Sequence, residues 1–171
     1  MSIMFTSFER STRYLGEKFA ICEHQPQHFN YPELTFFAPT NAEGKPVRSS
    51  DYFKRPKGGP LDPHEFYEAV DAYRKDLMAG FCNNMTEIGY WLKAITPKDD
   101  LVLCCWCPQS SSSKQQIKDL GVMACHSGIL AEVLTMCRPD ITVVLDVDRS
   151  ERLVPQWQFG QLEQSSLFPQ L

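Results

Sequence analysis

Residues 101–105 read Leu-Val-Leu-Cys-Cys, an apolar run that is uninterrupted and no longer than a strand. Runs of this kind are typical of parallel strands that are covered on both faces of a sheet. A second run, from Ile141 to Asp146, is rich in β-branched residues and also predicts a strand. Between them, Cys125 to Met136 carries apolar residues at helical spacing. A strand, a helix and a strand in succession indicate a parallel crossover unit.

The rest of the chain adds elements of both kinds. Its longest helical pattern opens with aspartate and proline, which are typical of an N-cap and a first helical residue. Its strands are short apolar runs that end at polar residues or at proline. We expect strands at residues 3–8, 18–23 and 34–38, and helices at residues 63–78, 85–95 and 114–120.

Strands that alternate with helices predict an α/β fold, here a three-layer Rossmann-like domain with a mostly parallel sheet. The 171 residues suffice for one hydrophobic core, so we assign residues 1–154 to a single α/β domain. Residues 155–171 are rich in glutamine and are predicted to form a C-terminal tail. Residues 39–60 lack apolar periodicity and are partly basic, which indicates either a solvated loop or an anion-binding flap.

The composition narrows the classes of function. A net charge of −4 disfavours a protein that coats nucleic acid through bulk electrostatics. No stretch approaches the roughly 18 continuous apolar residues of a membrane span, and the first residues lack a signal pattern, so we expect a cytoplasmic protein. In a reducing compartment, seven clustered cysteines indicate thiols that pack, bind metal or act as nucleophiles.

Cys125 stands at the predicted start of a helix, where unpaired N–H groups and the helix dipole favour a thiolate. His126 beside it would supply a proton relay or a positive partner. Because strand side chains alternate, Cys105 and Cys107 share one side, at the carboxyl end where α/β proteins bind ligands. We predict Cys125 and His126 as catalytic residues and Cys105 and Cys107 as pocket residues. The alternative is that these cysteines are small buried hydrophobes.

Arg10, Arg13 and Glu23 follow the first two predicted strands, and we place them in the same pocket. The two arginines are candidates to hold a phosphate group. No metal ligand set is assigned, because neighbouring helical residues such as Cys125 and His126 diverge by about 100° and do not easily ligate one ion. The chain lacks a deaminase motif, and it lacks the arginine that follows the nucleophile of a cysteine phosphatase. The sequence does not identify a cofactor.

Residues 103–107 (Leu-Cys-Cys-Trp-Cys) and 124–132 (Ala-Cys-His-Ser-Gly-Ile-Leu-Ala-Glu) carry a family resemblance. The chain resembles the uncharacterised bacterial and phage family catalogued as domain of unknown function 488, with its C-W-C…C-H relatives. In that family an apolar strand ends in cysteine, and Cys-His opens a helix. The resemblance implies the same fold and site from the first strand to Asp146, without a reaction. Where family members often carry two arginines, this chain reads Glu23-His24.

Residues 164–168 of the predicted tail read Gln-Ser-Ser-Leu-Phe. They resemble the short peptide by which bacterial repair and replication proteins bind the DNA sliding clamp. In such a peptide Leu167 and Phe168 would fill an apolar pocket, while Gln164 would form hydrogen bonds at its rim. A tether of this kind raises the effective concentration of a weak DNA binder. The alternative is a chance match in a frayed tail.

Three functions remain open. The first is an enzyme that acts on nucleotides or nucleic acid through Cys125, linked to DNA repair or replication by the sliding clamp. The second is a metal-binding or redox domain that uses the cysteines at 104, 105, 107 and 125. The third is a non-catalytic adaptor that binds a ligand with its domain and a partner with its tail.

Overall fold

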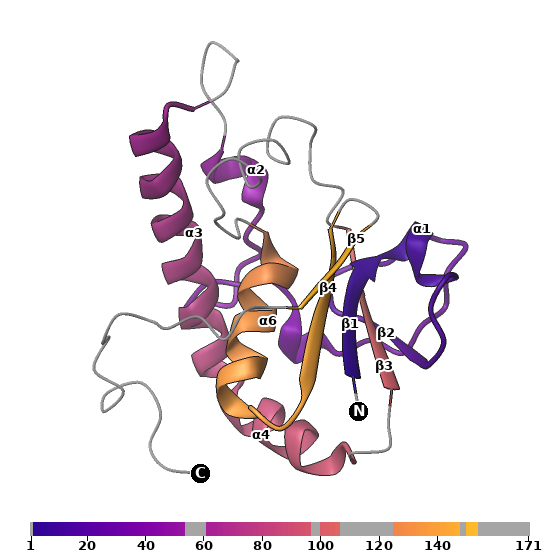
Figure 1. The fold of residues 1–171 in the computed structure, drawn as a ribbon. Coiled ribbons are helices and arrows are strands. Elements are labelled where there is room, and N and C mark those ends of the chain that lie inside the picture. Colours follow the sequence, from indigo (N-terminus) through magenta and orange to yellow (C-terminus); the bar gives the residue numbers. More distant parts are fainter. Residues whose placement is uncertain (1, 54–60, 97–99, 107–124, 148–149, 154–171) are drawn as a thin grey trace.

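The computed structural model describes residues 2–53, 61–96, 100–106, 125–147 and 150–153 (Figure 1). The elements in chain order are β1 (Ser2–Ser7), α1 (Phe8–Ser11), β2 (Glu17–Ala20), the 3-10 helix η1 (Thr35–Phe37), α2 (Ser49–Tyr52), α3 (Pro63–Asn83), α4 (Met85–Ala94), β3 (Asp100–Cys105), α6 (His126–Cys137), β4 (Thr142–Val147) and β5 (Ser150–Leu153). No helix within these ranges combines the length and the apolar content that a membrane crossing requires.

The strands form one sheet in the order β2-β3-β1-β4-β5. The first four strands are parallel, and β5 pairs antiparallel to β4 at the edge. Ser7 at the end of β1 lies beside Cys105 at the end of β3. The predicted α/β class and mostly parallel sheet are therefore confirmed.

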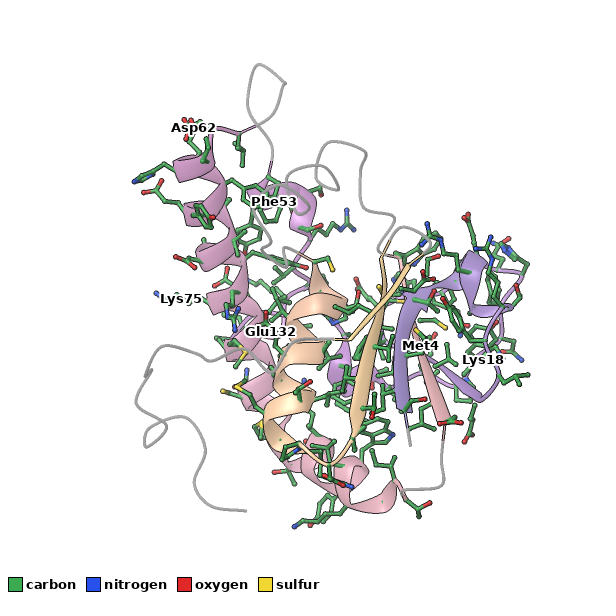
Figure 2. All side chains as sticks on the ribbon, viewed as in Figure 1. Met4, Lys18, Phe53, Asp62, Lys75 and Glu132 are labelled. Atoms are coloured by element: carbon green, nitrogen blue, oxygen red, sulfur yellow. The ribbon has the colours of Figure 1, made fainter. Side chains whose placement is uncertain are left out.

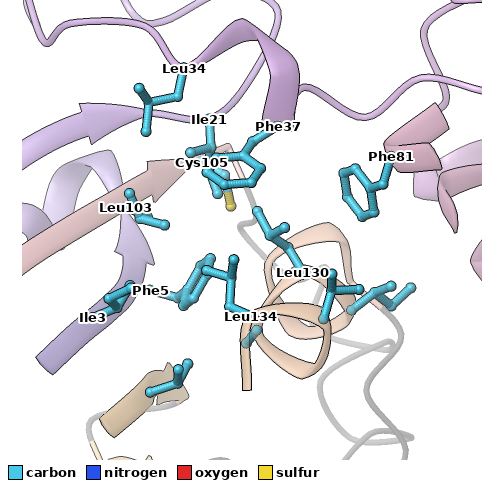
Figure 3. Packing of buried hydrophobic residues seen from close by; sticks show 14 of the residues in the cluster. Ile3, Phe5, Ile21, Leu34, Phe37, Phe81, Leu103, Cys105, Leu130 and Leu134 are labelled. Carbon is cyan, nitrogen blue, oxygen red and sulfur yellow. The ribbon is translucent and has the colours of Figure 1, made fainter. Parts of the chain in front are cut away.

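One face of the sheet is covered by α3, α4 and α6, and α6 lies between the sheet and α3 (Figure 1). All ten residues from Cys125 to Leu134 are buried, so this helix has no polar face over that length. Figure 3 shows Leu130 and Leu134 against Phe5 and Leu103 of the strands. Burial on both sides explains why apolar residues of this helix are not confined to one stripe.

The opposite face carries α1 and the chain that follows β2 (Figure 1). A smaller apolar cluster lies there, in which Phe8, Ala20, Cys22, Val102 and Cys104 are buried. Since Cys105 belongs to the core under α6, the two neighbouring cysteines of β3 point to opposite faces, as the alternation of strand side chains predicts. Among the described residues, the long helices thus lie on one face only.

The next described helices after β1 and after β3 lie on different faces. Helix α1, which follows β1, lies on the smaller-cluster face, whereas α6, which follows β3 in the described chain and precedes β4, lies on the other face. Neighbouring parallel strands with this arrangement form a topological switch point, and ligands of α/β proteins bind there, beyond the carboxyl ends. Ser7 and Cys105 mark this place.

Most predicted elements agree with the structure, but α1 was not predicted and β2 ends at Ala20, three residues before the predicted end of that strand. The predicted strand at residues 34–38 is wrong: η1 forms there because Ala38 N–H donates to the Thr35 carbonyl, and a short apolar run does not specify a strand. The long helix continues to Asn83, five residues beyond its predicted end. The helix α2 within the predicted loop and the edge strand β5 were not predicted.

The start of α3 follows the predicted capping pattern. Asp62 accepts a hydrogen bond from Glu65 N–H at 2.9 Å, and the Glu65 carboxylate accepts one from Asp62 N–H at 3.0 Å. Cys107, the predicted helix at residues 114–120 and the tail residues Gln164, Leu167 and Phe168 lie outside the described residues.

Candidate functional site

Cys125 is the N-cap of α6. Its φ of −123° and ψ of 156° are extended, and its Sγ accepts a hydrogen bond from the Gly128 N–H at 3.3 Å. A cysteine therefore takes the place that serine, threonine, asparagine or aspartate usually fills at a helix start. The thiol is 8% exposed, so water competes little for its sulfur. The predicted position of Cys125 at the start of a helix is confirmed.

The hydroxyl of Ser127 joins two cysteines. Its Oγ lies 3.2 Å from Cys105 Sγ and 3.8 Å from Cys125 Sγ, and all three side chains are buried. The end of β3 and the start of α6 thus meet at this hydroxyl. Sequence reasoning missed Ser127. The available signal was a hydroxyl two residues after an N-cap, within the first helical turn.

His126 makes its contact on a different side of the helix. Its Nε2 lies 2.6 Å from the Phe37 carbonyl oxygen, and its ring centroid is 6.1 Å from that of Phe81. Because a carbonyl only accepts, Nε2 carries the proton and Nδ1 is the basic nitrogen. Successive helical residues diverge by about 100°, which separates this contact from the Cys125 thiol. His126 therefore fixes the start of α6 against η1, and a relay role for it stays a prediction.

Arg10 belongs to a separate group at the same edge of the sheet. Its Nη1 lies 3.2 Å from Asp146 Oδ1, and Thr6 Oγ1 donates to Asp146 Oδ2 at 2.7 Å. The Asp146 side chain is 3% exposed, while that of Arg10 is 26% exposed. This group lies on the face that carries Phe8, whereas the two cysteines lie on the face that carries α6. Asp146 was also missed as a partner of Arg10.

Arg13 and Glu23 are exposed, in the segments that follow α1 and β2. Glu23 Oε1 lies 3.8 Å from His24 Nε2, and both side chains are largely in solvent. The backbone N–H of Arg13 donates a hydrogen bond to the Arg10 carbonyl. The structure therefore gathers Cys105 and Cys125 in one place and puts these two charged residues near the surface.

Cys104 lies apart from the cysteines around Ser127, on the other face of the sheet. Burial raises the pKa of its thiol to about 12, although a hydrogen bond from Ser11 acts in the opposite direction. Cys104 is consequently a neutral thiol near neutral pH, packed against Val102 on the smaller-cluster face. A metal site that uses both Cys104 and Cys105 does not fit, because these side chains point to opposite sides of the sheet.

Among the residues that the structure describes, no group of three or more histidine, cysteine, aspartate or glutamate side chains converges in a way that would hold an ion.

Comparisons with protein-family models, with curated proteins and with solved structures returned no match.

The cysteine group is equipped for thiol chemistry. The Gly128 N–H and the first turn of α6 provide positive partial charge at the Cys125 sulfur, and Ser127 provides a hydroxyl within reach of both sulfur atoms. These donors favour the anionic form of a thiol, which is the nucleophile and the form that reacts with oxidants.

Proposed function

We propose that the protein is a thiol-dependent enzyme that acts on nucleotides or nucleic acid, with Cys125 as the nucleophile. The observation that carries this proposal is the hydrogen bond from Gly128 N–H to Cys125 Sγ at the N-cap of α6. A backbone donor held by a helix cannot withdraw as a flexible side chain can, so its help to the thiolate is permanent. Attack by the thiolate on an electrophilic carbon or phosphorus would form a bond from sulfur to that atom and break the bond to its leaving group, which departs with the electron pair and takes up a proton. Water would then cleave the covalent intermediate and restore the thiolate.

Ser127 and Cys105 would act beside the nucleophile. The Ser127 hydroxyl donates to whichever sulfur carries negative charge, and Cys105 lies on its other side at 3.2 Å. His126 would serve as the proton relay that the sequence predicts, with its ring held by the contact of Nε2 with the Phe37 carbonyl. The topological switch point between β1 and β3 supports a substrate site at this edge.

Arg10 supports a nucleotide or nucleic acid as the substrate. Arg10 stands at the same edge and offers guanidinium donors beyond the Nη1 that binds Asp146. Family membership in domain of unknown function 488 is also proposed, supported by cysteines at a strand end and at the start of α6. A cytoplasmic location is also proposed, in agreement with the clustered cysteines of the sequence.

The test is the alkylation of Cys125 by iodoacetamide, followed by peptide mass spectrometry across a pH series. An activated thiolate reacts at neutral pH at a rate that changes little as the pH rises further, whereas a thiol without activation gains reactivity as the pH rises towards its pKa. Cys82, an exposed cysteine, serves as the internal reference. Cys125→Ser removes the modified peptide and serves as the assignment control. A Cys125 whose reactivity rises with pH in parallel with that of Cys82 contradicts the proposal.

The convergence of two thiols on Ser127 favours a second candidate, a redox dithiol. A peroxide would oxidise Cys105 and Cys125 to a disulfide, with the two thiol hydrogens and the peroxide oxygens leaving as water. Treatment with hydrogen peroxide and non-reducing peptide mapping would reveal the crosslink. Sulfenic or sulfinic acid on either cysteine without a crosslink would exclude this candidate.

The clamp-binding role of Gln164, Leu167 and Phe168 is proposed separately and would link the enzyme to DNA repair or replication. A chain in which all three residues are alanine should lose its retention on an immobilised sliding clamp, because the pocket anchors are removed. A chain with alanine at Ser165 and Ser166 is the matched control. Retention that survives the triple substitution contradicts this role.

A further inference from the structure

Trp106 directly follows β3 and is 53% exposed, although the five residues before it, Leu101–Cys105, are buried. A partly exposed aromatic is ordinary on a protein surface. This one stands at the carboxyl end of β3, beside the end of β1, and the next described helices after these two strands lie on opposite faces. That is the place at which α/β proteins bind their ligands.

The Trp106 indole is held by two contacts that do not cover it. Its Nε1–H donates to the His24 carbonyl, and its ring meets Phe8 at a centroid distance of 6.0 Å and an angle of 63°. Phe8 is 2% exposed and is supported by Phe29 and Tyr31 at 5.4 and 6.1 Å. The indole is therefore fixed before any ligand arrives, so stacking upon it costs little side-chain entropy.

A cationic group stands on the other side of Phe8. Arg10 follows Phe8 by two residues in α1, and its guanidinium is 26% exposed with Nη1 on Asp146. A fixed indole and a guanidinium on one edge match a ligand that has a planar base and a phosphate. An aromatic side chain of a peptide would satisfy the indole and leave the guanidinium donors beyond the Nη1 on Asp146 unused.

We propose that Trp106 is the stacking platform for the base of a nucleotide bound at the carboxyl ends of β1 and β3. This inference rests on the proposed function for its substrate class and adds the residue that recognises the base. Stacking on an indole tolerates any base, so Trp106 confers selectivity for bases over base-free phosphates, and not for one base over another. Cys105 directly precedes Trp106 in the chain, and its sulfur contacts the hydroxyl of Ser127 beside Cys125.

The test measures the affinity of the full-length protein for adenosine 5′-monophosphate by isothermal titration calorimetry, with ribose 5-phosphate as the ligand without a base. Trp106→Leu removes the aromatic surface, and Trp106→Phe keeps a smaller ring. Tyr90→Leu is the matched control, because Tyr90 is 71% exposed on α4, which lies at the end of the sheet away from Trp106 (Figure 1).

We expect Trp106→Leu to weaken binding of the mononucleotide by about tenfold or more, Trp106→Phe to weaken it less, and Tyr90→Leu to leave it unchanged. Ribose 5-phosphate should bind the wild-type protein as weakly as the mononucleotide binds Trp106→Leu. Equal affinity of wild type and Trp106→Leu, or equal affinity for the two ligands, overturns the inference. If Trp106→Leu does not fold, Trp106→Phe and the comparison of ligands decide alone.

The alkylation of Cys125 is measured without nucleotide, so the two proposals fail independently. A reactive Cys125 in a protein that does not bind the mononucleotide overturns the stacking platform and leaves the thiol enzyme. Binding that depends on Trp106 in a protein whose Cys125 is unreactive supports the platform and contradicts the thiol enzyme.

Discussion

The sulfur of Cys105 lies 3.2 Å from the hydroxyl of Ser127, and this contact joins the end of a strand to the first turn of a helix 22 residues later in the chain. The same hydroxyl reaches Cys125 Sγ at 3.8 Å. Two cysteines that are separate in the sequence thus share one small polar group in a buried place. Replacement of that group tests how far the two thiols depend on it.

Ser127→Ala is expected to slow the alkylation of Cys125 at neutral pH by about three- to tenfold, because one hydrogen bond to the thiolate is lost. The Gly128 N–H remains, so reactivity should not disappear. Alkylation rates at several pH values would measure the effect, with Ser50→Ala in exposed α2 as a control. An unchanged rate in Ser127→Ala would mean that the hydroxyl does not act on this sulfur.

Glu132 is 5% exposed and lies between α3 and α6, where Arg74 Nη2 approaches its Oε2 at 2.5 Å (Figure 2). Arg74→Met should destabilise the fold by about 3–5 kcal/mol at neutral pH, because it leaves a buried carboxylate without its partner. The double variant Arg74→Met, Glu132→Gln should recover much of that loss. Urea denaturation measures both, and equal stability of Arg74→Met and wild type would contradict the argument.

Burial raises the pKa of Glu132 above its ordinary value of 4.5, although Arg74 opposes the shift. The folded state therefore holds this proton more tightly than the unfolded state does. The tighter binding of the Glu132 proton stabilises the folded state. This stabilisation is fully present below the pKa of the unfolded state and is lost as the pH rises through the pKa of the folded state. Glu132→Gln should flatten the fall in unfolding free energy above pH 4.5, and an unchanged pH profile would contradict the shift.

Gly80 lies inside α3, where alanine would ordinarily stabilise a helix by about 1 kcal/mol. A Cβ at this position would lie 2.0 Å from the Thr40 carbonyl oxygen, which is backbone and cannot rotate away. Gly80→Ala is therefore expected to lower the melting temperature, by an amount equivalent to about 2 kcal/mol or more. The helix control is Ala72→Gly at an exposed site, which should cost about 1 kcal/mol. A melting temperature of Gly80→Ala above that of the wild type would show that α3 and the Thr40 carbonyl can move apart.

The pair of Arg10 and Asp146 should respond asymmetrically to truncation. Arg10→Ala leaves a carboxylate that is 3% exposed, whereas Asp146→Ala leaves a guanidinium that is 26% exposed and can be rehydrated. We expect the first variant to lose about 2–3 kcal/mol of unfolding free energy and the second clearly less. Chemical denaturation of both variants checks this order. Equal losses would mean that the Thr6 hydroxyl alone satisfies Asp146.

Sequence periodicity predicted the main strands and helices because it reports burial, and burial repeats with the geometry of each element. It also predicted that Cys104 and Cys105 face opposite sides, since that alternation follows from a single strand. The prediction of a strand at residues 34–38 was wrong because it also relied on burial. Leu34 and Phe37 are buried, but their burial is equally compatible with a 3-10 helix. Burial of a short run does not distinguish the two.

The sequence by itself determined that a cysteine caps α6 and that the strand before it ends in cysteine, because these are local features of order and spacing. Only the tertiary structure decided their partners. Arg10 pairs with Asp146 across 136 residues, and His126 binds the Phe37 carbonyl across 89. Such pairs depend on strand order and on the face that each crossover takes, and periodicity carries no information about either.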